Sequence, residues 1–172
     1  MDGSRRRIVV GVSGSLGSLA ALHRAVADAR PLGVPVVPVL AWEPPGGEIG
    51  YRRSPCPPLL AVVRDSAAAR LTAALEEAFG GTDPGVPLEP LTVRGEAGRA
   101  LVGIADRPGD LLVVGAGGSR LRRGLRPSVA AHCVRRSVCP VLAVPRPQLQ
   151  HDLDALHLRN LWHLPARPAA VR

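Results

Sequence analysis

The chain has 172 residues, a length typical of one domain, and its 46% hydrophobic content excludes a wholly disordered protein. No run reaches the roughly 20 apolar residues of a membrane-spanning helix, and the N-terminus lacks the apolar run of a signal peptide, so we expect no membrane contact and a cytoplasmic location. The formal net charge is +8, carried by 22 Arg and no Lys.

Apolar runs alternate with segments of helical periodicity along most of the chain. In order, we expect a strand at 8–12, a helix at 16–30, a strand at 34–42, a helix at 59–79, a strand at 88–94, a helix at 96–106, a strand at 110–115, a helix at 128–137 and a strand at 139–144. This alternation predicts an α/β fold, a single doubly wound five-stranded parallel sheet with helices on both faces.

Two segments fall outside this pattern. Residues 43–58 hold five Pro and three Gly, so we expect a loop without regular structure there. Residues 148–172 follow a Pro-rich junction and carry Leu at partly helical spacing, so we divide the chain into a domain at 1–147 and a partly helical C-terminal tail.

Cysteine and histidine spacing argues against a metal site. The three cysteines, at 56, 133 and 139, contain no CxxC pair, and we expect Cys133 and Cys139 to be small core residues. The tail histidines at 151, 157 and 163 are six residues apart, so they do not share one helix face.

The positive charge is concentrated in one part of the chain. Residues 111–151 hold seven Arg and no acid, whereas the rest holds 15 Arg against 14 acids. This asymmetry indicates an anionic partner near that window. The window has no aromatic residue to stack on bases, which leaves only a weak, sequence-blind nucleic-acid contact as a less favoured function.

Two loops at the expected carboxyl ends of strands are candidates for the site, the one after residue 12 and the one after residue 115. Gly115, Gly117 and Gly118 allow a close approach of the backbone to a ligand. Ser128 stands at the start of a predicted helix, where it either binds a phosphate or caps the helix.

Three segments, in order and at the right separation, resemble the universal stress protein family over about residues 6–146. They are Ile8-Val9-Val10-Gly11-Val12-Ser13-Gly14-Ser15, Asp110-Leu111-Leu112-Val113-Val114-Gly115 and Cys139-Pro140-Val141-Leu142-Ala143-Val144-Pro145. The resemblance implies an adenine nucleotide alpha hydrolase-like fold and, as in many members, ATP binding. The residues it places at the nucleotide are Val12, Ser13, Ala41, Gly115, Gly118, Pro127, Ser128 and Val129.

This chain departs from the family's nucleotide motif at three points. Ser13 stands where the family has Asp, Pro127 stands at the third Gly and has no N–H, and the spacer before it is one residue short. Losing two or three polar contacts weakens binding by about 30-fold to 2,000-fold. Arg side chains in the basic window offset part of this loss through charge-assisted hydrogen bonds.

The resemblance therefore leaves two functions open. One is a non-catalytic stress-response module that binds an adenine nucleotide or another phosphate anion. The other is an interaction protein with a degenerate pocket that does not bind ATP. The resemblance implies a homodimer through the last strand, with Val141, Leu142 and Val144 at its surface.

An enzyme is the less favoured class, because no activated nucleophile or general base stands out. Residues 13–18 are similar to the Ser-Gly-Gly-x-Asp-Ser loop of PP-loop ATP pyrophosphatases, but Gly17 replaces its Asp.

Overall fold

The structure is a computed structural model that describes residues 6–116 and 128–145. Five parallel strands form one sheet in the order β3-β2-β1-β4-β5. Their bounds are β1 Ile8–Gly11, β2 Val36–Trp42, β3 Leu91–Arg94, β4 Leu111–Gly115 and β5 Val141–Val144. The expected doubly wound α/β fold is confirmed.

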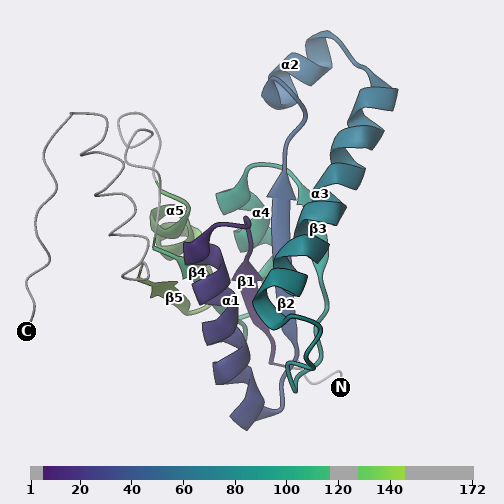
Figure 1. Cartoon of the computed structure of the whole chain (residues 1–172). Helices are drawn as coiled ribbons and strands as arrows, with labels where there is room; N and C mark the ends of the chain where they lie inside the picture. Colours follow the sequence, from purple (N-terminus) through teal and green to yellow (C-terminus); the bar gives the residue numbers. More distant parts are fainter. Residues whose placement is uncertain (1–5, 117–127, 146–172) are drawn as a thin grey trace, which may run out of the picture.

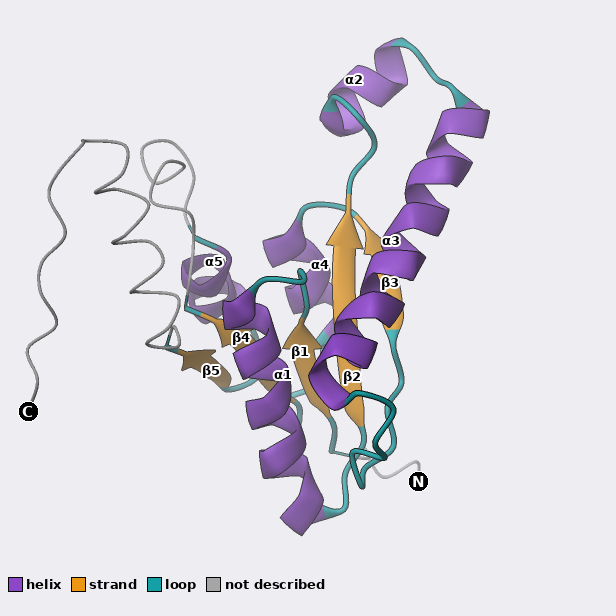
Figure 2. Ribbon diagram, viewed as in Figure 1, coloured by secondary structure: helices purple, strands orange, loops and turns teal. Residues whose placement is uncertain are grey.

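Helices cover both faces of the sheet, as Figures 1 and 2 show. Their bounds are α1 Leu16–Ala29, α2 Gly47–Arg53, α3 Pro57–Phe79, α4 Ala97–Ile104 and α5 Val129–Arg136, with a short 3₁₀ turn at Arg30–Leu32. α1 and α3 pack on one face, and α4 and α5 pack on the other. Among the described residues, no helix is long and apolar enough to cross a membrane.

The strand β1 lies at the centre of the sheet, between β2 and β4. Val9 and Val10 are fully buried because their side chains point to opposite, helix-covered faces. A strand that is covered on both faces has a continuous run of apolar residues in its sequence. For this reason apolar and polar residues do not alternate in this segment.

A partly buried ion pair ties β1 to β4 at the amino edge of the sheet. Arg7 precedes β1, and its guanidinium donates to the carboxylate of Asp110, which precedes β4, at 3.1–3.3 Å. It also donates to the carbonyl of Ile104, at the end of α4, at 2.7 Å. Because the Asp110 side chain is fully buried and accepts these hydrogen bonds, its charge is compensated in the core. The same contact raises the pKa of Arg7.

The strand and helix boundaries agree with the sequence-based expectations to within about three residues. Leu88 falls outside β3 and forms only an isolated bridge with Val36. Ser15 caps α1, where its hydroxyl accepts from the amide of Ser18 at 3.3 Å. Gly80 ends α3 in the left-handed conformation at φ 56°, which glycine adopts without steric cost. The predicted loop at 117–127 and the tail lie outside the described residues.

The expectation that residues 43–58 lack regular structure is wrong. They contain α2, and α3 begins at Pro57, so that α2 and the first half of α3 form an arm projecting beyond the carboxyl edge of the sheet (Figure 1). A seven-residue helix is not stable alone, so its local sequence predicts a loop. Pro57 fits the start of a helix because the first amides have no intrahelical acceptor.

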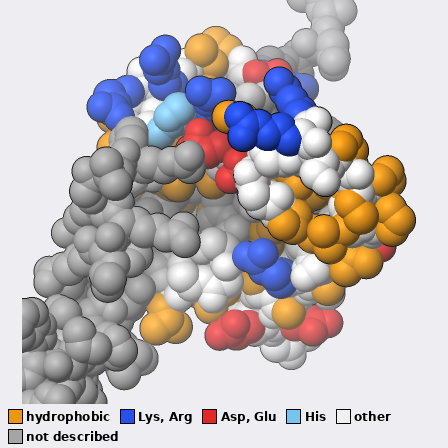
Figure 3. All heavy atoms as spheres, turned by 90° about the horizontal axis from the view of Figure 1, so that it is seen from above, with side chains coloured by type: hydrophobic (Ala, Val, Ile, Leu, Met, Phe, Trp, Pro, Cys, Tyr) orange, Lys and Arg blue, Asp and Glu red, His pale blue; other side chains and the backbone are white. Residues whose placement is uncertain are grey.

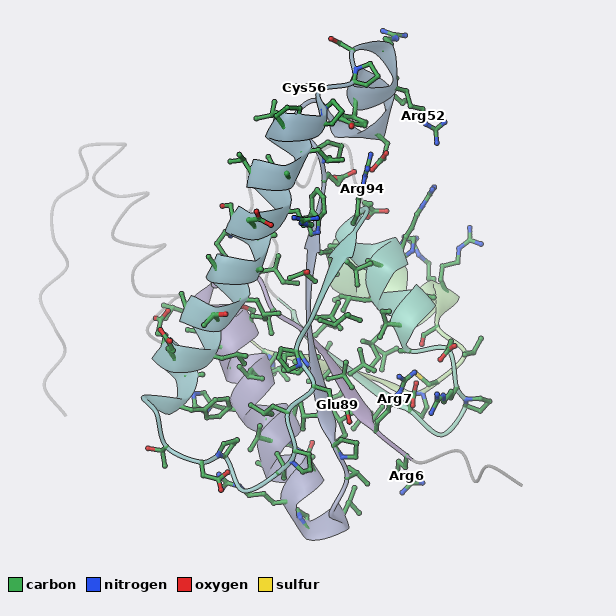
Figure 4. The ribbon with its side chains drawn as sticks, turned by 90° about the vertical axis from the view of Figure 1, so that its right-hand side faces the viewer. Arg6, Arg7, Arg52, Cys56, Glu89 and Arg94 are labelled. Atoms are coloured by element: carbon green, nitrogen blue, oxygen red, sulfur yellow. The ribbon has the colours of Figure 1, made fainter. Side chains whose placement is uncertain are left out.

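A contact distant in sequence holds α2 in place. Arg94, the last residue of β3, donates to both carboxylate oxygens of Glu48 at 2.7 and 2.9 Å, and its guanidinium lies 4.8 Å from the ring centroid of Tyr51. Figure 4 shows Arg94 pointing toward α2. This pair lowers the pKa of Glu48, so the contact persists through neutral and mildly acidic pH and is lost only as pH falls through that lowered pKa.

The cysteines follow the expected pattern of burial. Cys133 and Cys139 are buried core residues, and Cys56 is exposed on the projecting arm. Burial raises the pKa of the Cys133 thiol to about 11, so this thiol stays protonated and unreactive at neutral pH.

We predict that Glu48→Gln releases α2 from the sheet, since a neutral amide does not hold the Arg94 guanidinium as a carboxylate does. Trypsin cleavage after Arg52 and Arg53 is then faster than in the parent protein, with the rest of the domain intact. Glu77→Gln, on an exposed position of α3 without an ion pair among the described residues, is the control and leaves the cleavage rate unchanged. Equal rates in all three proteins would show that Arg94 does not restrain the arm.

Candidate functional site

The order of the strands reverses at β1 and β4. The crossover from β1 leads through α1 to β2 on one side, whereas the chain reaches β4 on the other side from β3 through α4. In such sheets the diverging connections leave a crevice beyond the carboxyl ends of the strands. A pocket of about 150 Å³ opens at this point. Its lining comes from Gly11, Val12, Ser13, Ser15, Gly17, Ser18, Val39, Ala41, Arg70, Ala97, Leu101, Val114, Gly115 and Val129.

The structure brings five of the eight sequence-predicted residues together in this one pocket, namely Val12, Ser13, Ala41, Gly115 and Val129. Ser128 is next to Val129 and caps α5, since its hydroxyl accepts from the amide of Ala131 at 3.2 Å. Its hydroxyl hydrogen is not used in that contact. Gly118 and Pro127 lie outside the described residues.

Sequence reasoning missed the residues that α3 and α4 contribute to the pocket. Arg70 comes from α3, and Ala97 and Leu101 come from α4. These residues belong to helices with no local ligand motif, and only the crossing of the helices over the sheet edge brings them to the site. The loop after β1 was a candidate, and it supplies Ser13 and Ser15, while the first turn of α1 that follows it supplies Gly17 and Ser18.

A network of hydrogen bonds closes the loop between β1 and α1. The buried hydroxyl of Ser18 accepts from the amide of Ser13 at 3.1 Å and donates to the carbonyl of Ser15 at 2.8 Å. The Ser13 amide is therefore already used within the loop. The exposed hydroxyls of Ser13 and Ser15 lie 3.0 Å apart and share one hydrogen, which leaves one hydroxyl hydrogen free to reach a ligand.

The first turn of α1 packs directly on the last residue of β4. A Cβ atom added to Gly115 would lie 2.8 Å from the carbonyl oxygen of Gly17, a contact with rigid backbone. Glycine is therefore required at position 115 because a side chain would collide with the backbone of Gly17. Its φ angle is not positive, so backbone strain is not the reason. This contact places the α1 N-terminus, where the helix dipole is positive, at the pocket.

The pocket has two walls of different character. Ala97, Leu101 and Val129, from the α4 and α5 side, form an apolar wall. Ser13, Ser15 and Arg70, from the α1 and α3 side, form a polar wall with a positive charge. In the space-filling view of this edge, basic and a few acidic side chains lie among uncharged ones around a hollow near the centre (Figure 3). Among the described residues, the pocket lining contains no Asp or Glu.

Comparison with known proteins identifies the family. The sequence model of the universal stress protein family matches residues 4–145. The chain therefore belongs to the universal stress protein family. No curated protein sequence matches the chain.

Solved structures agree with this assignment. A universal stress protein in complex with cAMP is 30% identical, with a TM-score of 0.55, and the match covers 83% of this chain and 98% of that one. UspA from Lactobacillus plantarum is 20% identical, with a TM-score of 0.63 and coverage of 83% and 99%. A universal stress protein from Archaeoglobus fulgidus in complex with dAMP is also 20% identical, with a TM-score of 0.50 and coverage of 81% and 97%.

We predict that Gly115→Ala lowers the free energy of unfolding by about 1–3 kcal/mol, because the new methyl group forces α1 away from β4. Gly103→Ala is the control: Gly103 lies in α4 with no heavy atom within 4 Å of an added Cβ, so this change raises stability by up to ~1 kcal/mol. Urea unfolding of both variants measures the difference. A Gly115→Ala protein as stable as the parent would contradict the close packing of α1 on β4.

Proposed function

We propose that the protein is a non-catalytic module that binds an adenine nucleotide in the pocket at the carboxyl ends of β1 and β4. The observation that carries this proposal is the position of the pocket, at the one point where the strand order reverses in a doubly wound sheet. The relative with 30% identity, which is in complex with cAMP, supports the same ligand class.

The chemistry of the lining supports a flat, largely apolar ligand group such as a purine ring. Val39 and Ala41 come from β2, Val114 comes from β4, and Leu101 adds an apolar side chain from α4. Apolar pockets with a few polar groups are typical of small-ligand sites, where the apolar surface contacts the ligand and the polar groups fix its orientation. Ser128, at the N-terminus of α5, is the position at which the family motif places a hydrogen bond to phosphate.

A binding role is favoured over catalysis by the side chains at the pocket. Among the described residues, the lining contains no His, Cys, Asp or Glu that could act as a general base or activate a nucleophile. The two exposed hydroxyls, of Ser13 and Ser15, are hydrogen-bonded to each other and have no base as partner.

We expect the full-length protein to bind cAMP, AMP or ATP with a Kd below about 100 µM in calorimetry. Ala41→Phe places a ring in the pocket and should abolish the binding heat. The control is Ala73→Phe, an exposed position of α3 outside the pocket, which should leave binding unchanged. No heat with any of the three nucleotides would contradict the proposal and favour a protein that acts through protein contacts alone.

A second proposed property is homodimerisation through β5. The strand β5 pairs with β4 on one side, and in the described residues no strand lies on its other side. The carbonyls of Pro140 and Val144 bond to the β4 side, so the alternate amides of Val141 and Ala143 point to the open edge. The exposed side chains of Val134 and Val138 add apolar surface close to this strand in the sequence.

We predict that Ala143→Pro weakens such a dimer, since it removes an edge-facing amide without breaking a bond to β4. The apparent mass in size-exclusion chromatography with light scattering should move toward the monomer at low micromolar concentration. The control is Ala73→Ser, at an exposed position of α3, which leaves the mass unchanged. A proline at this position would break α3 and is not used. A parent protein that is monomeric at all concentrations would contradict the proposal.

A further inference from the structure

The α1 and α3 side of the pocket carries a positive group that the family motif does not include. Arg70 lines the pocket from the middle of α3, on the wall opposite Ala97 and Leu101. It is the one charged side chain in the lining among the described residues. The family motif, in contrast, places the phosphate contacts at the loop after β4 and at Ser128.

Within residues 6–116 and 128–145, Arg70 forms no ion pair. Arg64, earlier on the same helix, pairs with Asp65 at 3.0 Å, and Arg94 pairs with Glu48 at 2.7 Å. A guanidinium at a pocket without a carboxylate partner is available to a ligand, because its five N–H donors match the oxygens of a phosphate or carboxylate group.

The neighbouring groups on this wall also favour a negatively charged ligand. The Ser13 and Ser15 hydroxyls share one hydrogen bond at 3.0 Å, so one O–H remains as a donor toward the pocket. The first turn of α1, which includes Gly17 in the lining, adds its positive dipole end. The position where the family has an acid is Ser13, so no carboxylate opposes an anion here.

We propose that this wall is an anion subsite, in which Arg70 and a hydroxyl of the Ser13–Ser15 pair hold a phosphate group of the bound ligand. The inference rests on the proposed function for the rest of the ligand, the adenosine part against the apolar wall. It makes Arg70 the residue that selects nucleotides over nucleosides. The phosphate is then oriented toward α1 and α3, on the opposite side from Ser128.

The test compares AMP with adenosine in calorimetry, using the parent, Arg70→Gln, Arg70→Lys and Arg64→Gln. Arg64→Gln removes the same charge from the same helix outside the pocket. We expect Arg70→Gln to weaken AMP binding roughly 10-fold or more, the typical loss for a charge-assisted hydrogen bond, with adenosine binding unchanged. Arg70→Lys should recover part of the AMP affinity, and Arg64→Gln should match the parent with both ligands.

Two outcomes of the calorimetry would overturn the inference. Equal losses for AMP and adenosine would show that Arg70 contacts the base or ribose, and an unchanged AMP affinity would show that it contacts no phosphate. If the parent binds neither of these ligands, and neither cAMP nor ATP, the proposed function fails, and thermal unfolding with inorganic pyrophosphate decides the subsite separately. A stabilisation that Arg70→Gln removes and Arg64→Gln retains supports the anion subsite, and equal or absent stabilisation rejects it.

Discussion

The pairing of β1 with β4 is the interaction on which the rest of the molecule depends, because the strand order reverses there. Two contacts lie at opposite edges of the sheet, one between the residues that precede β1 and β4 and one between β4 and the first turn of α1, which follows β1. At the amino edge, Arg7 donates to the buried carboxylate of Asp110. At the carboxyl edge, the backbone of Gly17 packs on Gly115 without room for a side chain. The buried apolar strands between these contacts form the core, and the pocket opens directly above it.

The positive charge at the pocket depends on two residues of this chain together. Ser13 places a hydroxyl where the family has an acid, and Arg70 brings a guanidinium from another helix. A single acid in this position would pair with the guanidinium and cancel its effect on a ligand. The sequence indicates an anionic partner near the basic window at 111–151, and Arg70 adds a positive charge at the pocket from outside that window.

Elements with strong local patterns were predictable, and those that depend on distant contacts were not. The continuous apolar run of β1 is typical of a buried strand. Ser15 and Gly80 are residue types that favour the start and the end of a helix, and they lie at the start of α1 and the end of α3. The helix α2 was missed because seven residues with several Gly and Pro do not form a stable helix alone. Its position depends on Arg94, which is 46 residues away from Glu48 in the sequence.

The sequence by itself determined the fold class, the family resemblance and five residues that meet in one pocket, because periodicity, glycines and strand ends are local properties. The tertiary structure alone decided which helices complete that pocket and what charge it carries. Arg70 has no motif around it, and its place in the pocket lining depends on how α3 packs on the sheet and extends past its carboxyl edge. That packing involves residues far apart in the chain.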